Sequence, residues 1–251
     1  MNSPLLAMPL AAVGEVGEGF LKERSAESLG CVAKPSHLFC GSWAIHHLGE
    51  YVTPARQQLE MVVISVLIGF AIAFVLALLA RRFRYLDPPL LAGTGILFAI
   101  PSVAFFLLLL PITGRGRETA IIALTAYTLQ IIYRNVMVGF RDVPESSKDA
   151  ARGMGLTERQ ILWKVEVPLA IPEIVAGLRV AVVSTMAIAT LATFVHAGGL
   201  GEKITGRGNL SFPTTIIIAG VLAILMALVL DAFLLLGQRF ATPWRRAEAI
   251  A

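Results

Sequence analysis

The chain alternates between long apolar stretches and short connecting segments that carry most of its charge. Five stretches are long and apolar enough to cross about 30 Å of hydrocarbon as helices, which takes roughly 20 residues each. They are Met61–Ala80, about Pro89–Ile112, about Thr119–Val138, Ile174–Val195 and Pro213–Leu236. This pattern predicts an all-α integral membrane protein with about five transmembrane helices in residues 60–238.

The five stretches differ in character. The first contains no charge, and the second is interrupted by Pro101, which kinks a helix or breaks it into halves. The third is less apolar, so one of its faces should meet protein or water rather than lipid. Its polar residues are Thr125, Tyr127, Thr128, Gln130, Tyr133 and Arg134.

Basic residues indicate the orientation, because Lys and Arg collect in cytoplasmic loops. If the first span ends inside, the cytoplasmic segments hold Arg81, Arg82, Arg84, Arg141, Lys148, Arg152, Arg159, Lys164, Arg239, Arg245 and Arg246. The short outer loops hold Arg115, Arg117, Lys203 and Arg207, and the N-terminal tail adds Lys22, Arg24, Lys34 and Arg56. The asymmetry predicts an outside N-terminus and a cytoplasmic tail at residues 239–251.

Composition agrees with a membrane protein. Hydrophobic residues make up 56% of the 251 residues and charged residues only 15%, against about 25% charged in soluble domains. This excludes a cytosolic enzyme, a nucleic-acid-binding module and a disordered chain. The net charge of +4 follows from the basic loops, so no nucleic-acid partner is expected. The two cysteines, Cys31 and Cys40, match no metal-ligand spacing, and a disulfide between them stays open as an alternative to free thiols.

The N-terminal region divides into two segments. Residues 1–41 begin apolar but lack a basic start and run into a charged stretch, which makes a poor signal peptide. We expect a poorly ordered extracytoplasmic leader there. Residues 42–59 should form an interfacial helix, because apolar residues recur at near-helical spacing. They are Trp43, Ile45, Leu48, Tyr51 and Val52.

The loop at residues 142–172 predicts two short helices. Pro144 suits a first helical position, and Gly155 suits a left-handed cap at the end of the first helix. Thr157 and Gln160 have capping-box spacing and begin a second helix, Glu158–Val165. Pro168 and Pro172 are expected to end that helix and return the chain to the membrane. Ile161, Leu162 and Val165 form an apolar edge, so the hairpin is suited to docking in a groove of another protein.

This loop resembles the EAA loop of ABC importer permeases. That signature is Glu-Ala-Ala, three residues, Gly, nine residues and Ile-x-Leu-Pro; its positions here are Asp149, Ala150, Ala151, Gly155, Val165, Val167 and Pro168. The three departures, at residues 149, 165 and 167, are conservative. The resemblance implies that these seven residues couple the chain to an ATPase. The two alanines would permit close approach, and Asp149 would cap a helix or pair with a basic group of the partner.

Further segments look like osmoprotectant permeases for glycine betaine, carnitine and choline. They are IPSVAFFLLLLPITGRG, IIYRNVMVGFRDVP, DAARGMG and HAGGLGEKITGRGN, and the likeness extends from about Trp43 to Arg246. It implies a type I importer in a bacterial inner membrane. Two permease subunits, alike or different, would pair, a cytoplasmic ABC ATPase dimer would receive the hairpins, and an external binding protein would deliver the solute.

The chain is expected to be a translocation subunit rather than an enzyme. It contains no GxxxxGK[ST] phosphate loop, because Glu202 stands where GGLGEKIT would need glycine. We therefore expect no cofactor in this chain and ATP binding in the partner subunit.

Several polar residues within the spans are further candidates. Arg179 and Asp231 lie at similar depths, so we expect an ion pair joining the last two spans, as a structural tie or, alternatively, a substrate contact. A translocation path could be lined by Thr125, Tyr127, Gln130, Tyr133 and His196. Hydrogen bonding between helices is the competing role for these groups.

The substrate is less well determined than the class. An aromatic cage would suit a quaternary ammonium, but Tyr127 and Tyr133 face different ways on a helix. Selectivity is therefore expected mainly in the binding protein. The alternatives are a permease for an amino acid or a sulfonate and, from another class, an ion-coupled secondary transporter or channel. The latter two would more often show repeated hydropathy or mid-membrane charges.

Overall fold

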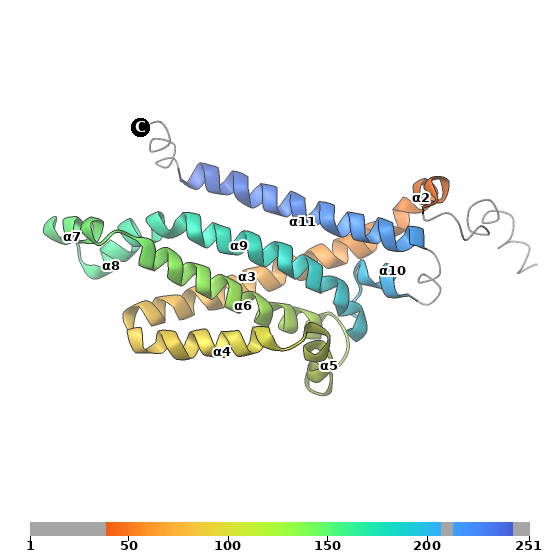
Figure 1. Ribbon diagram of the computed structural model, residues 1–251, viewed down its shortest axis with the longest axis horizontal. Coiled ribbons are helices and arrows are strands. Elements are labelled where there is room, and N and C mark those ends of the chain that lie inside the picture. Colours follow the sequence, from red (N-terminus) through yellow and green to blue (C-terminus); the bar gives the residue numbers. More distant parts are fainter. Residues whose placement is uncertain (1–38, 207–212, 243–251) are drawn as a thin grey trace, which may run out of the picture.

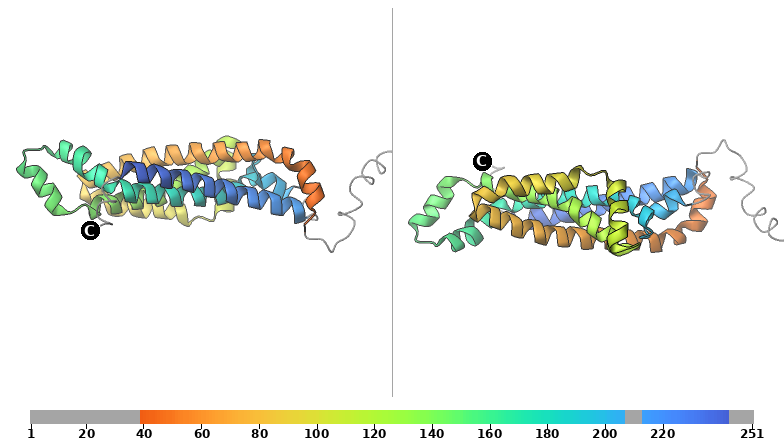
Figure 2. Two further views of the ribbon diagram at one scale, coloured as in Figure 1. Left: turned by 90° about the horizontal axis from the view of Figure 1, so that it is seen from above. Right: turned by 90° about the horizontal axis from the view of Figure 1, so that it is seen from below.

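The computed structural model describes residues 39–206 and 213–242. All regular elements in these ranges are helical, as predicted. Five helices form an elongated bundle (Figures 1 and 2); they are α3 (Val52–Arg82), α4 (Asp87–Ala99), α6 (Arg117–Asp142), α9 (Val167–Ala189) and α11 (Pro213–Ala241). The shorter elements are α2 (Gly41–His47), η1 (Leu48–Tyr51), η2 (Arg84–Leu86), α5 (Ser102–Thr113), α7 (Glu145–Gly153), α8 (Glu158–Ile161), η3 (Leu162–Glu166), η4 (Thr190–Val195) and α10 (Gly201–Thr205).

Four described helical segments are long and apolar enough to span a membrane. They are Trp43–Arg82, Arg117–Asp142, Glu158–Val195 and Pro213–Ala241. The predicted second span is instead a pair, α4 and α5, bent by 96°. The break falls at Ile100 and Pro101, whose backbones are both extended. The 13 residues of α4 cover only about 20 Å, which is less than the thickness of the hydrocarbon core. Helix α5 does not extend this length, because it lies across the bundle (Figure 1).

Helix α6 lies at the centre of the bundle, against α3 and α9. Small residues permit the close approach, as is common between membrane helices. On α3, Ala73, Ala77 and Ala80 are all buried. A Cβ added to Gly69 of α3 would lie 1.9 Å from Thr128 Oγ1 of α6. The buried surface of α6 thus depends on glycine and alanine in its neighbours.

The interfacial helix predicted for residues 42–59 is shorter than expected. Helix α2 and η1 end at Tyr51, and residues 52–59 form the first two turns of α3. The reason is tertiary: Gln57 and Gln58 on these turns hydrogen-bond to the loop before α10, which joins the segment to the bundle. The predicted leader at residues 1–41 lies outside the described residues apart from its last three positions, and so does Cys31.

The predicted end of the second loop helix is wrong. Neither Pro168 nor Pro172 ends it, because the chain is helical from Glu158 to Val195. The π-helical turn η3 immediately precedes Pro168, which lies in the first turn of α9. A π turn shifts the hydrogen-bond register by one residue, and a first-turn proline needs no N–H partner. Helix α9 therefore begins at Val167, inside the predicted loop, and the first helix of the loop begins at Glu145, one residue after Pro144.

Candidate functional site: a helical hairpin and its charged anchor

Helices α7 and α8 form a hairpin that projects beyond one end of the bundle (Figures 1 and 2). The chain reverses at Gly155, whose φ is +80°. Its N–H donates to the Arg152 carbonyl at 2.9 Å, and the Leu156 N–H donates to the Ala151 carbonyl at 3.1 Å. These two bonds form a Schellman motif with glycine at its left-handed position. The predicted cap is confirmed.

The second helix of the hairpin begins with a capping box, also as predicted. The Gln160 N–H donates to Thr157 Oγ1 at 3.4 Å, and the Thr157 N–H donates to Gln160 Oε1 at 2.8 Å. Both bonds satisfy amide groups that would otherwise lack a partner at the start of the helix. The hairpin therefore has a defined turn at its tip.

Helix α7 exposes one face and turns the other toward the bundle. Ser146, Ala150, Gly153 and Met154 are exposed and recur at helical spacing, with Met154 73% exposed. Ala151 on the opposite side is buried. Three of these four residues are small, so little side-chain volume projects from this strip. It can enter a cleft closely, which the sequence led us to expect of a docking hairpin.

The seven predicted coupling residues do not share one surface. Asp149, Ala150 and Gly155 are exposed, Ala151 is buried, and the remaining three are half-buried. The residues in the last group are Val165, Val167 and Pro168. Three of the four residues in the first half of the signature thus lie on the free surface of the hairpin, whereas its second half lies where η3 continues into α9.

The predicted apolar edge of the second helix is not free for docking. Ile161 is fully buried, Leu162 and Val165 are half-buried, and Leu162 packs against the core of the bundle. Helical spacing showed that these residues share an edge but not which way it faces. The exposed apolar side chains are instead Met154 and Trp163, whose ring lies 6.3 Å from that of Phe74 between centroids.

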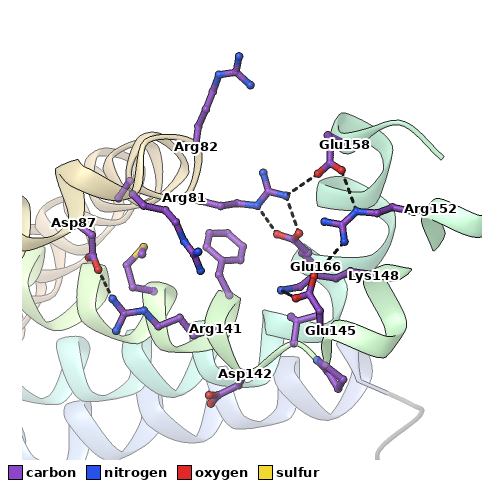
Figure 3. A pocket seen from close by; sticks show the side chains of 16 residues that line it. Arg81, Arg82, Asp87, Arg141, Asp142, Glu145, Lys148, Arg152, Glu158 and Glu166 are labelled. Atoms are coloured by element: carbon purple, nitrogen blue, oxygen red, sulfur yellow. Dashed lines mark hydrogen bonds and ion pairs between the residues drawn. The ribbon is translucent and has the colours of Figure 1, made fainter. Parts of the chain in front are cut away.

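An ion pair anchors the hairpin to the C-terminal end of α3 (Figure 3). Arg81 forms two hydrogen bonds with the Glu166 carboxylate, of which Nη2 to Oε1 is 2.7 Å long. The Glu166 side chain is only 5% exposed. A buried carboxylate loses its hydration, so its charge is tolerated only with a well-placed partner. Arg81 is the partner that the structure supplies.

Further charges extend this anchor to the tip of the hairpin. Glu158 lies 4.0 Å from Arg81 and accepts a 3.2 Å hydrogen bond from Arg152. Arg152 in turn pairs with Glu145 at 3.1 Å and with Asp149 at 2.9 Å. Asp149, which we expected to cap a helix or to pair with a partner protein, is thus paired within its own helix.

The paired charges line a cleft of about 930 Å³ between the hairpin and the ends of α3 and α6. Hydrogen bonds from Lys148 and Arg152 lower the pKa of the Glu145 carboxyl below its ordinary value. Three carboxylates, that of Glu158 first, raise the pKa of Arg152. Because the carboxyl pKa is lowered and the guanidinium pKa is raised, both groups stay ionised at neutral pH. The Glu145 pairs are lost only as the pH falls through its lowered pKa.

A second clamp holds α4 against α6. Asp87 at the start of α4 pairs with Arg141 and accepts a 2.8 Å hydrogen bond from the Tyr133 hydroxyl. Tyr133 is fully buried. By contrast, Arg82 and Asp142 point away from these pairs in Figure 3.

The predicted path residues do not converge within one subunit. Thr125 and Tyr127 are buried and donate to carbonyls of Ser65 and Ile100, and Tyr133 binds Asp87. Gln130 is half-buried and accepts a hydrogen bond from Thr94. His196 is exposed near the opposite end of the bundle, in a left-handed conformation with a φ of +56°. Thr125, Tyr127 and Tyr133 thus bond to neighbouring segments of the same subunit. A role of the five residues in the passage stays a prediction.

Arg179 and Asp231 form an ion pair between α9 and α11. Arg179 Nε donates to Asp231 Oδ1 at 2.7 Å, and Nη2 donates to Oδ2 at 2.8 Å. Both side chains are half-buried. The two parallel bonds fix the relative position of the helices as well as their charges.

One cluster was missed from the sequence. Gln58 is completely buried, accepts from the Leu200 N–H at 2.9 Å and donates to the Met186 carbonyl at 3.2 Å. Gln57 accepts from the Gly199 N–H at 3.2 Å. The two glutamines join the loop between η4 and α10 to α3. No local sequence pattern relates residues so far apart in the chain.

Known proteins are similar to this chain in sequence. The family model of binding-protein-dependent transport system inner membrane components matches residues 38–246. The glycine betaine/carnitine/choline permease OpuCD of Bacillus subtilis is 35% identical over 83% of this chain and 91% of its own. The osmoprotectant import permease OsmW of Salmonella typhimurium is also 35% identical, over 80% and 96% of the two chains.

Solved structures give the same fold at lower identity. An inward-facing structure of the MetNI methionine ABC transporter matches with a TM-score of 0.67 and 24% identity, over 76% of this chain and 95% of that one. An amino acid ABC transporter solved with histidines matches with a TM-score of 0.66 and 17% identity, over 78% and 95%. With the family match spanning most of its length, this chain belongs to the binding-protein-dependent inner membrane components, the permease subunits of ABC importers.

Proposed function

We propose that this permease imports a quaternary-ammonium osmoprotectant across a bacterial inner membrane, driven by a separate cytoplasmic ATPase dimer. The observation that carries the proposal is the hairpin: a helical tip with capped ends that projects from the bundle and exposes Asp149, Ala150 and Gly155 of the EAA-like signature. In this scheme the ATPase binds all the ATP, and this chain converts its movement into opening of the passage.

The substrate class rests on the sequence relatives. The relatives named for glycine betaine, carnitine or choline are 32% to 35% identical, for example the choline permease OpuBB of Bacillus subtilis at 32%. The amino acid transporters share the fold at 17% to 24% identity. This difference favours an osmoprotectant over an amino acid. In the complex, an external binding protein delivers the solute to a pair of permease subunits.

The hairpin role can be tested with two substitutions at one exposed position. The complex of permease, ATPase and binding protein is reconstituted in proteoliposomes, and ATP hydrolysis is measured with the binding protein loaded with glycine betaine, choline or methionine. Ala150→Glu places an unpaired charge on the docking face, so we expect stimulated hydrolysis to fall more than about tenfold. Ala150→Ser keeps the residue small and should retain the stimulation.

The docking role of the hairpin and the substrate assignment can each be contradicted without the other. If Ala150→Glu couples as well as the wild type, the hairpin does not dock on the ATPase. If only the methionine-loaded form stimulates the intact complex, the docking stands and the osmoprotectant assignment is wrong.

A further inference from the structure

Arg134 is a charge on the surface of a membrane-spanning helix. It lies on α6, eight residues before Asp142, which is about 12 Å from the cytoplasmic end. Its side chain is exposed in the single subunit. Among the described residues no carboxylate lies within 4.0 Å of it, although Arg81, Arg141 and Arg179 each have one. An unpaired charge at this depth is costly against lipid, so this face of α6 must meet water or another polar group.

The residues around Arg134 form a pocket. It has a volume of about 460 Å³ and lies between the cytoplasmic halves of α4 and α6, in the size range of small-molecule sites. Its lining residues are Asp87, Leu91, Gln130, Arg134, Met137, Val138 and Arg141. The charged groups are two guanidiniums and one carboxylate, and that carboxylate is already bound by Arg141 and Tyr133. The pocket therefore has an excess positive charge at Arg134.

Gln130 provides a second polar group on the same side of α6. It lies four residues before Arg134, so the two side chains are neighbours on one face of the helix. Its Oε1 accepts from Thr94, while its Nε2 has no acceptor among the described residues. Two sets of unused N–H donors, one helical turn apart, match the two oxygens of a carboxylate.

We propose that Arg134 and Gln130 bind the carboxylate of the solute in the cytoplasmic half of the passage. The permease itself then favours zwitterionic betaines, which carry a carboxylate, over choline, which carries a hydroxyl in its place. Leu91, Met137 and Val138 supply apolar surface for the methyl groups of the same solute. This inference rests on the proposed function and names the part of the osmoprotectant that the passage recognises.

The experiment compares two solutes in the same vesicles. Uptake of labelled glycine betaine and labelled choline is measured in proteoliposomes containing the whole complex, with a binding protein that delivers both. Arg134→Gln removes the charge, Arg134→Lys keeps it, and Arg82→Gln makes the same change at an arginine that does not line this pocket. Basal ATP hydrolysis and elution of the assembled complex report folding.

Loss of a hydrogen bond to a charged group should lower the ratio of glycine betaine to choline uptake about tenfold in Arg134→Gln. Arg134→Lys should lie between this variant and the wild type, and Arg82→Gln should not change the ratio. Equal losses for both solutes would assign Arg134 to subunit packing and overturn the inference. An unchanged ratio with full uptake would overturn it as well. If the wild type takes up neither solute, it is the proposed function that fails.

Discussion

Single charged residues join the coupling hairpin to the bundle. Arg81 lies in the last turn of α3, Glu158 begins α8, and Glu166 ends η3. The two carboxylates meet one guanidinium, and Arg152 continues the chain of charges toward the tip. A displacement of the hairpin by the ATPase would therefore pull directly on α3.

Single and double substitutions of the Arg81–Glu166 ion pair should differ in their effect on stability. Arg81→Met leaves the Glu166 carboxylate buried without a partner, which we expect to lower the free energy of unfolding by about 3 kcal/mol. Combining it with Glu166→Met removes both charges and should recover most of that stability, because apolar groups can replace a buried ion pair. Unfolding of the purified complex in detergent measures both effects.

The neighbouring Arg82 serves as the control, since its side chain points away from the anchor (Figure 3). Arg82→Met should leave stability nearly unchanged. If the double variant is as unstable as Arg81→Met alone, packing rather than an unpaired charge causes the loss.

At the scale of helices, close packing of α3, α6 and α9 depends on positions without side chains. Gly69 faces Thr128, and Gly177 faces Asn135, whose Cβ would lie 2.4 Å from an added methyl group. Helix α11 differs, because only 22% of its most apolar window is buried. Large apolar side chains such as Val229 and Phe233 are exposed on it. The central helices are therefore sensitive to added volume, whereas α11 tolerates it on its outer side.

Two glycine substitutions test this difference. Gly69→Ala would place a methyl group 1.9 Å from Thr128 Oγ1, and such overpacking typically costs about 1–3 kcal/mol. Gly220→Ala on α11 meets nothing within 4 Å and should be neutral or slightly stabilising, because alanine is the better helix former. Thermal unfolding in detergent compares them. A similar loss at both positions would contradict the packing argument.

At the scale of the whole molecule, the two ends of the bundle differ in shape and charge. The hairpin, the basic end of α3 and the last turn of α11 share one end, while α2 and α10 lie at the other (Figure 1). By the positive-inside rule, we expect the hairpin end to lie in the cytoplasm. This is also the end at which an ATPase would bind. Shape and charge thus support the same orientation, with the N-terminal side outside.

Cysteine labelling can determine the orientation. In a background with Cys31 and Cys40 replaced by serine, Ile45→Cys and Ser146→Cys place exposed thiols at opposite ends. In intact right-side-out vesicles, an impermeant maleimide should label only the first. After permeabilisation it should label both. Labelling of Ser146→Cys alone in intact vesicles would reverse the orientation.

Local signals in the sequence predicted much of the fold. The apolar stretches marked the spans because each must fill the same thickness of hydrocarbon, and the break at Pro101 followed from the missing N–H. The glycine cap and the capping box were also predicted, since their hydrogen bonds join residues only a few positions apart. The EAA-like spacing identified the hairpin for the same reason.

Only the tertiary structure decided how these parts face one another. It continued the helix through Pro168 and Pro172, turned the Ile161 edge inward and paired Arg81 with Glu166, 85 positions away. It also left Arg134 exposed while neighbouring Tyr133 is buried. The sequence by itself determined the apolar stretches, the break at Pro101 and the two caps of the hairpin, because those signals are local. Which helix face meets which neighbour depends on packing among segments far apart in the chain. No local pattern encodes this packing.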